Sequence, residues 1–101
     1  MKMNCRCGHV ILDATDHLPH KGHVIADTEW LPLLEAIDEL VAQTGPSPRE
    51  KEATIMQIRS RIGSASRFIW QCAQCGDLYL DHPGDTAAHF KAVNDLAPGA
   101  L

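Results

Sequence analysis

The sequence lacks a long apolar run, a secretory leader and any internal repeat. No stretch of the 101 residues approaches the ~18 consecutive apolar residues that a membrane-spanning helix needs. The first residues, Met1-Lys2-Met3-Asn4, lead directly into a cysteine without the apolar segment of a secretory signal. No low-complexity tract or linker divides the chain. We therefore expect a cytoplasmic protein without a membrane partner, folded as one domain over residues 1–101.

The sequence also lacks an excess of positive charge. The 9 Lys and Arg residues stand against 13 Asp and Glu residues, and the net charge is −4 with histidine neutral. A general nucleic-acid binder needs a basic surface that displaces counterions from phosphates, so this balance argues against that class. Hydrophobic residues make up 45% and charged residues 22% of the chain. This mixture is typical of a globular protein and excludes a disordered one.

Cysteine is scarce, but it occurs in two close pairs. The segments are Cys5-Arg6-Cys7-Gly8 and Cys72-Ala73-Gln74-Cys75-Gly76. In a reducing compartment, such pairs predict metal ligands before disulfides. Two cysteines one or two residues apart can present both sulfurs from one tight turn, and the glycine that follows lets the backbone direct amides at sulfur. The sequence therefore predicts a metal site with four thiolate ligands: Cys5, Cys7, Cys72 and Cys75.

These segments resemble the zinc-ribbon class, which has rubredoxin-like cysteine knuckles. The resemblance covers Cys5 to about Leu12 and Phe68 to about Leu80. It implies that two knuckles from neighbouring β-hairpins clamp one zinc ion per chain, with the four cysteines as ligands. The chain departs from the class in two ways. The first pair has one spacer residue where two are commoner, and 64 residues separate the two pairs.

Other fates of the four sulfurs stay open at this stage. Iron in a rubredoxin-like electron carrier uses the same four-sulfur geometry, and the cysteines could instead form disulfides. A catalytic zinc generally keeps three protein ligands and an open position for water, which four thiolates do not leave. We therefore expect a structural zinc ion whose binding stabilises the fold, and a protein that is not an enzyme.

Two helices are predicted between the cysteine pairs. Asp27–Gln43 has apolar residues at helical spacing, with Asp27 or Thr28 as N-cap and Gly45 as a left-handed C′ residue. A capping box at Ser47-Pro48-Arg49-Glu50 starts a second helix that should stop near Gly63. The pair should form an antiparallel hairpin. The apolar stripes are Trp30, Leu33, Leu34, Ile37, Leu40 and Val41 in the first helix and Ile55, Ile58 and Ile62 in the second.

Short apolar or alternating segments predict strands around the cysteines. His9–Leu12 and His23–Ala26 are strand candidates in the first part of the chain. Arg67–Gln71 and Asp77–Asp81 alternate as the two arms of a β-hairpin with the second cysteine pair at its tip. A turn is expected at 82–85 and a frayed end at 98–101. Within 86–93 the pattern is ambiguous, and we favour a third strand over a helix.

The expected fold class is therefore α+β. Zinc-ribbon β-hairpins from about residues 1–26 and 67–93 would be clamped by one metal ion, and an antiparallel two-helix hairpin would be inserted at about 27–63.

Charge separates the two predicted helices. The first has five acidic residues and no Lys or Arg, whereas the second is basic overall. Glu35, Asp38 and Glu39 lie away from the apolar stripe, where they form either a solvated surface or a docking site for a basic partner. The leading hypothesis is a zinc-stabilised protein that binds a protein partner through these three residues. Its size and acidity are similar to those of many bacterial inhibitor and immunity proteins, a likeness of composition and not of motif.

The alternative hypothesis is a nucleic-acid-associated ribbon, as many zinc ribbons are. Phe68 or Trp70 would stack on bases beside a local basic patch. The basic residues are Lys51, Arg59, Arg61 and Arg67.

Two further residue types need an interpretation. Trp30 and Trp70 are expected to pack in the interior. The histidines of the loop, His17, His20 and His23, are expected to be solvated and to bind no second metal. His9 and His82 lie beside the cysteine segments, where they are either surface residues or hydrogen-bond partners of sulfur.

Overall fold

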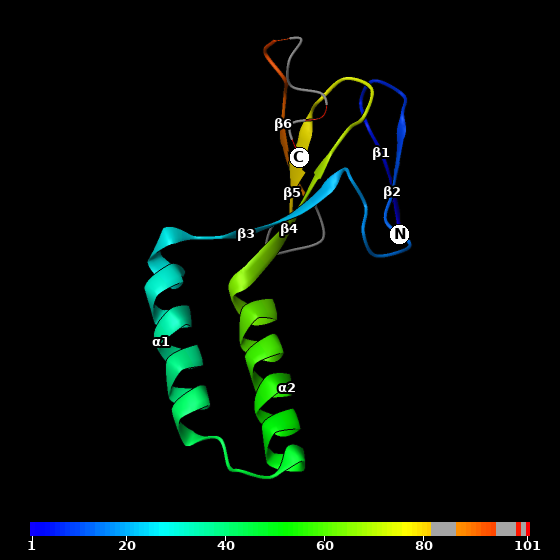
Figure 1. The fold of residues 1–101 in the computed structure, drawn as a ribbon. Coiled ribbons are helices and arrows are strands. Elements are labelled where there is room, and N and C mark those ends of the chain that lie inside the picture. Colours follow the sequence, from blue (N-terminus) through cyan, green and yellow to red (C-terminus); the bar gives the residue numbers. More distant parts are fainter. Residues whose placement is uncertain (82–86, 95–98, 100) are drawn as a thin grey trace. The chain divides into compact units, whose positions relative to one another are not determined.

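The computed structural model describes residues 1–81, 87–94, 99 and 101 (Figure 1). The chain divides into two compact units. The first, which we call the cysteine unit, comprises Met1–Val24 and Arg67–Leu101, and the second, the helical unit, comprises Ile25–Ser66. The fold class is α+β, with two helices and two antiparallel sheets among the described residues. Within the described part of the chain, no helix has the length and hydropathy that crossing a membrane requires.

A two-stranded sheet carries the first cysteine pair. Strands β1 (Lys2–Asn4) and β2 (Val10–Leu12) are antiparallel, with Met3 opposite Ile11. Strand β2 confirms the strand expected at His9–Leu12, but β1 was not predicted from the sequence. Its three residues are too short to show a pattern, and the pairing becomes visible only once the cysteine turn closes.

A four-stranded sheet, in the order β3-β4-β5-β6, carries the second cysteine pair. The predicted hairpin is confirmed, because β4 and β5 pair antiparallel with Trp70 opposite Tyr79. Strand β6 confirms the preference for a strand within 86–93. The turn expected at 82–85 lies outside the described residues. The strand expected at His23–Ala26 begins earlier and ends one residue sooner. The bounds are β3 Lys21–Ile25, β4 Ser66–Gln71, β5 Leu78–Leu80 and β6 Ala88–Phe90.

The core of the cysteine unit forms around the cysteines themselves. One inward residue from β2, one from β4 and one from β5 (Ile11, Trp70 and Tyr79) pack against the buried Cys5 and Cys72. Trp70 therefore packs in the interior as predicted, with 5% of its surface exposed. A core of so few residues stabilises a fold only weakly by burial alone.

The helical unit consists of α1 (Asp27–Gln43) and α2 (Pro48–Ala65), which pack against one another as the predicted hairpin. At the connecting loop, the Thr54 hydroxyl donates a hydrogen bond to the Thr44 hydroxyl over 2.8 Å. Ser47 is the N-cap of α2, and its hydroxyl accepts a hydrogen bond from the Glu50 N–H. This confirms the strongest helix-start signal in the sequence.

Three details of the helix ends were predicted wrongly. The N-cap of α1 is Ala26, which offers no side-chain acceptor, and not Asp27 or Thr28. Positive φ angles among the described residues do not include Gly45. Its missing side chain instead leaves room for the Glu50 carboxylate. Helix α2 continues through Gly63 to Ala65, because a single glycine costs a helix only about 1 kcal/mol.

The predicted apolar stripes are buried only in part. In α1 the buried residues are Leu33 and Ala36, and α2, all of which the structure describes, has none. Trp30, expected in the interior, is 46% exposed. The helical unit therefore leaves much of its apolar surface uncovered.

Candidate metal centre

The two cysteine turns have the same hydrogen-bonded design. The Cys5 N–H donates to the His9 carbonyl and the Cys72 N–H to the Asp77 carbonyl, over 2.8 and 2.9 Å. Inside each turn, the glycine N–H donates back to the carbonyl of the first cysteine over 2.9 Å. The first turn is one residue shorter, as its single spacer requires, and it closes in the same way. The unusual Cys-x-Cys spacing is therefore compatible with a ligand pair.

Both turns use glycine where the backbone is left-handed. Gly8 has φ 96° and Gly76 has φ 82°, a region that other residues rarely adopt. This confirms the role predicted for the glycine after each pair. In the first turn, the backbone N–H of His9 lowers the pKa of the Cys7 thiol, although burial and neighbouring thiols raise it overall. His9 thus acts on sulfur through its main chain.

The four sulfurs converge on one point. The Sγ atoms of Cys5 and Cys75 lie 3.5 Å apart, and those of Cys7 and Cys72 lie 3.6 Å apart. All four lie within 4.8 Å of one another, and all four cysteines are free thiols. A tetrahedral ion with metal–sulfur bonds of about 2.3 Å sets its sulfurs about 3.8 Å apart. The predicted ligands are therefore positioned to bind a metal ion, as the sequence indicated.

The thiols hold their protons unequally. Burial raises the pKa of Cys5, but the backbone N–H of Cys7 and the Tyr79 hydroxyl stabilise its thiolate and lower the pKa to about 6. At Cys75 the backbone N–H of Asp77 lowers the pKa of the thiol. Burial and the three other thiols outweigh it and raise that pKa to about 12. Four thiolates at this separation repel each other unless a cation lies between them. The site therefore favours a soft divalent cation.

A buried carboxylate joins the two turns. Asp77 directly follows the second turn and has no exposed side-chain surface. Its Oδ2 accepts a hydrogen bond from Arg6 Nε of the first turn over 2.8 Å, and its Oδ1 accepts one from the Ala92 N–H over 3.0 Å. The Ala92 N–H is the largest contribution that lowers the pKa of Asp77, followed by His89. The carboxylate therefore stays ionised and holds the spacer residue of the first turn beside the second turn.

An aromatic pair extends this network. The ring of His89 stacks on that of Tyr79, with centroids 4.5 Å apart and planes 4° apart, and Nε2 of His89 lies 2.8 Å from Oδ2 of Asp77. The Tyr79 hydroxyl accepts a hydrogen bond from the Arg6 N–H over 3.3 Å. Burial and the nearby Cys5 raise the pKa of Tyr79 to about 12, so the hydroxyl keeps its proton.

This network of Arg6, Asp77, Tyr79 and His89 was not predicted from the sequence. Arg6 is the spacer of the first pair, and Asp77 comes directly after the Cys-x-x-Cys-Gly segment of the second turn, so both positions were visible as neighbours of ligands. His89 lies in the segment whose secondary structure was ambiguous. Only the pairing of β5 with β6, which sets Tyr79 opposite His89, brings it to the site.

The histidine-rich loop makes other contacts. His20 Nε2 lies 2.6 Å from the Leu12 carbonyl oxygen, and the His23 ring meets the Phe68 ring edge-on. Among the described residues, no second group of His, Cys, Asp or Glu converges as a metal site. His82 lies outside the described residues.

The residues named for the alternative hypothesis come from both units, with Lys51, Arg59 and Arg61 in the helical unit and the others in the cysteine unit. Trp70 is buried and hydrogen-bonded through Nε1 to Asp13 over 2.9 Å, so it is not available for stacking. Arg59 and Arg61 are two residues apart on α2, a spacing that directs their side chains to different sides of a helix. Phe68, which is 39% exposed, already carries the ammonium of Lys21 over its ring at 4.2 Å.

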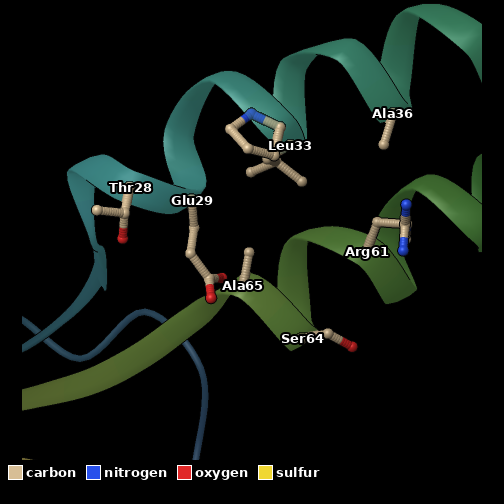
Figure 2. A pocket seen from close by; sticks show the side chains of 8 residues that line it. Thr28, Glu29, Leu33, Ala36, Arg61, Ser64 and Ala65 are labelled. Atoms are coloured by element: carbon tan, nitrogen blue, oxygen red, sulfur yellow. The ribbon is translucent and has the colours of Figure 1, made fainter.

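The acidic residues expected to bind a partner are exposed on α1. Glu35 and Asp38 lie on the side of the helix away from the buried Leu33 and Ala36, whereas Glu39 follows Ala36 by three residues and lies on the same side as it. Between them, α1 and α2 border an open groove of about 300 Å³ (Figure 2). Its lining combines small residues with Glu29 of α1 and Arg61 of α2, and consists of Thr28, Glu29, Pro32, Leu33, Ala36, Arg61, Ser64 and Ala65.

Comparison with protein families matches residues 1–95 of the chain to the family described as Domain of unknown function (DUF8617). The chain belongs to this family. Neither the curated proteins nor the solved structures contain a match to the chain. Because the family description names no activity, the geometry of the site carries the functional argument.

Proposed function

We propose that this member of the family is a non-enzymatic, zinc-stabilised protein-binding module. The cysteine unit is its metal-clamped frame, of the zinc-ribbon kind, and the helical unit presents its docking surface. The observation that carries the proposal is the convergence of four free thiols, two from each turn, within 4.8 Å.

The donor set supports a structural zinc ion. Cys5, Cys7, Cys72 and Cys75 supply four sulfurs and would fill a tetrahedral coordination sphere, so no position remains for a water molecule or substrate. Zinc bound in this way contributes its binding free energy to folding. Arg6, close to the sulfurs and paired with Asp77, supplies positive charge beside a cluster that is negative when zinc is bound.

Metal content tests the first half of the proposal. The chain, purified from cells without added metal, should show one zinc ion per molecule in native mass spectrometry and elemental analysis. The matched control is Ala73→Ser, an exposed position inside the second turn, against Cys72→Ser at a buried ligand. Stoichiometric zinc in the control and its loss in Cys72→Ser support the site. A visible absorption band from iron, or a mass that shows two disulfides and no metal, would contradict the zinc assignment.

The acidic surface of α1 supports protein binding. Glu35, Asp38 and Glu39 are exposed and no basic residue lies on α1 to neutralise them. Leu31, 64% exposed, precedes Glu35 by four residues and so lies next to it on the same side. An apolar contact bordered by carboxylates suits a partner with a basic surface around an apolar pocket. An inhibitor or immunity-type protein of this size would use such a surface.

A charge-matched pair of variants tests the second half. We expect the zinc-loaded wild-type chain to capture one basic protein from its native lysate in a salt-sensitive complex, identified by native mass spectrometry. The double reversal Glu35→Lys/Glu39→Lys should abolish the complex. Asp16→Lys/Glu52→Lys changes two exposed acidic residues elsewhere by the same charge and should leave it intact. Equal binding by both double variants would remove the acidic surface from the proposal.

A further inference from the structure

The helical unit leaves seven large apolar side chains exposed, and all but Leu31 and Met56 belong to one set. We call this set the apolar face: Trp30 46%, Leu34 38%, Val41 56%, Ile55 49% and Ile62 40% exposed. Scattered exposed apolar residues are normal on a protein surface, but a contiguous group marks an interaction surface.

These residues lie on one side of the hairpin. Ala36 and Arg61 line both the groove of Figure 2 and a second groove of about 340 Å³ along the same helices, so the two grooves share one side. At about 100° per residue, the α1 members of the apolar face lie about 120–160° around the helix from Ala36, and the α2 members about 100–120° from Arg61. Because the two helices are antiparallel, the same rotation runs clockwise on one helix and anticlockwise on the other when both are viewed from one end of the hairpin. The α1 members and the α2 members of the apolar face therefore both lie on the side away from the grooves.

The spacing on α1 is that of a helix bundle. Trp30, Leu34, Ile37 and Val41 follow one another at intervals of four, three and four residues. On α2, Ile55, Ile58 and Ile62 follow at intervals of three and four. This alternation makes a continuous apolar seam along each helix, of the kind that packs in four-helix bundles.

The helical unit has too little buried surface to complete itself. It spans Ile25–Ser66, and its only buried helix residues are Leu33 and Ala36. Units of about 40 residues usually need a metal, disulfides or association to fold stably. The described cysteines all belong to the other unit, so association is the route left to the helices.

We propose that the apolar face is a homodimer interface, in which the helical units of two copies form an antiparallel four-helix bundle with α1 of each copy against α2 of the other. Two features favour a second copy as the occupant. The helices are about 25 Å long and together about 20 Å wide, and a corrugated face of this size approaches the ~800 Å² per partner that a stable dimer buries. The apolar face also has members on both helices, which a second hairpin matches better than a single docked peptide helix.

Charge selects the arrangement within the dimer. Helix α1 carries Asp27, Glu29, Glu35, Asp38 and Glu39 without a basic residue, whereas α2 carries Arg49, Lys51, Arg59 and Arg61 against Glu50 and Glu52. Placing α1 against α1 would oppose acidic helices, but α1 against α2 of the partner opposes unlike charge. A two-fold axis parallel to the helices gives this pairing and brings the margin residue Asp38 toward Arg59 of the other copy. The dimer does not rest on the proposed function, since Glu35 and Glu39 point outward from the bundle and stay accessible.

Sedimentation equilibrium of the zinc-loaded full chain tests the proposal. The wild type should have twice the 11.1 kDa mass of the chain and dissociate on dilution. Leu34→Glu and Ile55→Glu each place a charge in the apolar face and should yield monomers with unchanged zinc content. Met56→Glu is the matched control, because Met56 is 59% exposed and lies about 100° around α2 from Ile55, outside the apolar face. A wild type that stays monomeric at all concentrations, or an Ile55→Glu variant that dimerises as well as Met56→Glu, would overturn the interface.

If an apolar variant loses its helices, a charge swap still tests whether the apolar face is the dimer interface. Asp38→Arg and Arg59→Asp are surface substitutions, and each alone should weaken the dimer by about fivefold. The double variant should recover the wild-type dissociation constant. Recovery supports the antiparallel pairing of α1 with α2, and equal, additive losses contradict it. Retention of the dimer by Glu35→Lys/Glu39→Lys keeps this test separate from the test of partner binding.

Discussion

The two units of the chain differ in what holds them together. In the cysteine unit, the buried residues surround four sulfurs and a fully buried carboxylate, Asp77. In the helical unit, two residues of α1 are buried, and α2 exposes Ile55 and Ile62. The first unit concentrates polar and metal-binding groups inside, whereas the second leaves apolar groups outside. The two units thus offer different binding groups: the sulfurs can hold a cation, and the exposed apolar side chains can pack against another apolar surface.

Removal of the metal should have the largest effect on stability, and it should act on the cysteine unit and not on the helices. Zinc binding to four thiolates contributes of the order of 10 kcal/mol to folding at neutral pH. Cys72→Ser, or a strong chelator, should therefore unfold the cysteine unit while the helices persist in the dimer. Fluorescence of Trp70 in a Trp30→Phe background reports the first unit, and far-UV circular dichroism reports the helices. Simultaneous loss of both signals would show that the two units fold as one.

Loss of the buried carboxylate should have the next largest effect. Asp77→Asn replaces a carboxylate that hydrogen-bonds to three residues by an amide that also donates, so its donors would face those of Arg6 and His89. Hydrogen-bond partners around a metal site typically change its affinity by about 10–100-fold, and we expect a loss of zinc affinity of that order. Competition with a chromophoric chelator measures it.

Two controls sharpen this prediction. Asp81→Asn removes an exposed carboxylate near the end of β5 and should leave zinc affinity unchanged. Arg6→Ala should cost less than Asp77→Asn, because the Arg6 side chain is 49% exposed and water replaces its hydrogen bonds. An Asp77→Asn chain that binds zinc as tightly as the wild type would show that the carboxylate does not position the turns.

The same contrast explains what could be predicted from the sequence. The cysteine ligands and the Ser47 cap were predictable because each depends on residues close together in the chain. Arg6 and Asp77 are 71 residues apart, and their contact follows from the convergence of the two cysteine turns. His89 needed the register of β5 with β6. Such pairings leave no local signal, so a search of motifs misses them.

For the helical unit, the elements were predicted correctly but the burial of their residues was not. Periodicity located both helices and their apolar residues, but it predicted the same burial for Trp30 and Val41, which are exposed, as for Leu33, which is buried. A pattern shows which residues need cover and does not show whether cover comes from the same chain. The residues predicted to be buried and found exposed are those that the dimer would cover.

Acid sensitivity offers a smaller effect within the cysteine unit. Lys21, then Trp70, hydrogen-bond Asp13 and lower its pKa in the folded state. A depressed folded pKa gives stability that is present above the unfolded value of about 4 and is lost as the pH falls through the folded value. Asp13→Asn should therefore destabilise the chain by about 1–3 kcal/mol at neutral pH, and by less in acid. Urea unfolding of both chains at a series of pH values measures the difference.

Zinc release in acid affects both chains of that comparison, so the difference between them isolates Asp13. A gap that stays constant from neutral to acid pH would show that the ionised carboxylate contributes nothing to folding. A gap that closes as the pH falls supports the pairing with Lys21 and Trp70.

Glycine-to-alanine substitutions should have the smallest effects, and opposite ones in the two units. A Cβ atom at either Gly8 or Gly63 would meet no atom within 4 Å, so packing does not distinguish them. Gly8 has φ 96°, and Gly8→Ala should cost about 1–2 kcal/mol of strain at the first cysteine turn. Gly63 lies inside α2, where alanine should stabilise the helix by about 0.5–1 kcal/mol. Thermal unfolding of the zinc-loaded chain measures the change in stability for both variants. Because the two sites differ only in backbone conformation, equal changes in melting temperature of the same sign would contradict the left-handed conformation of the first cysteine turn.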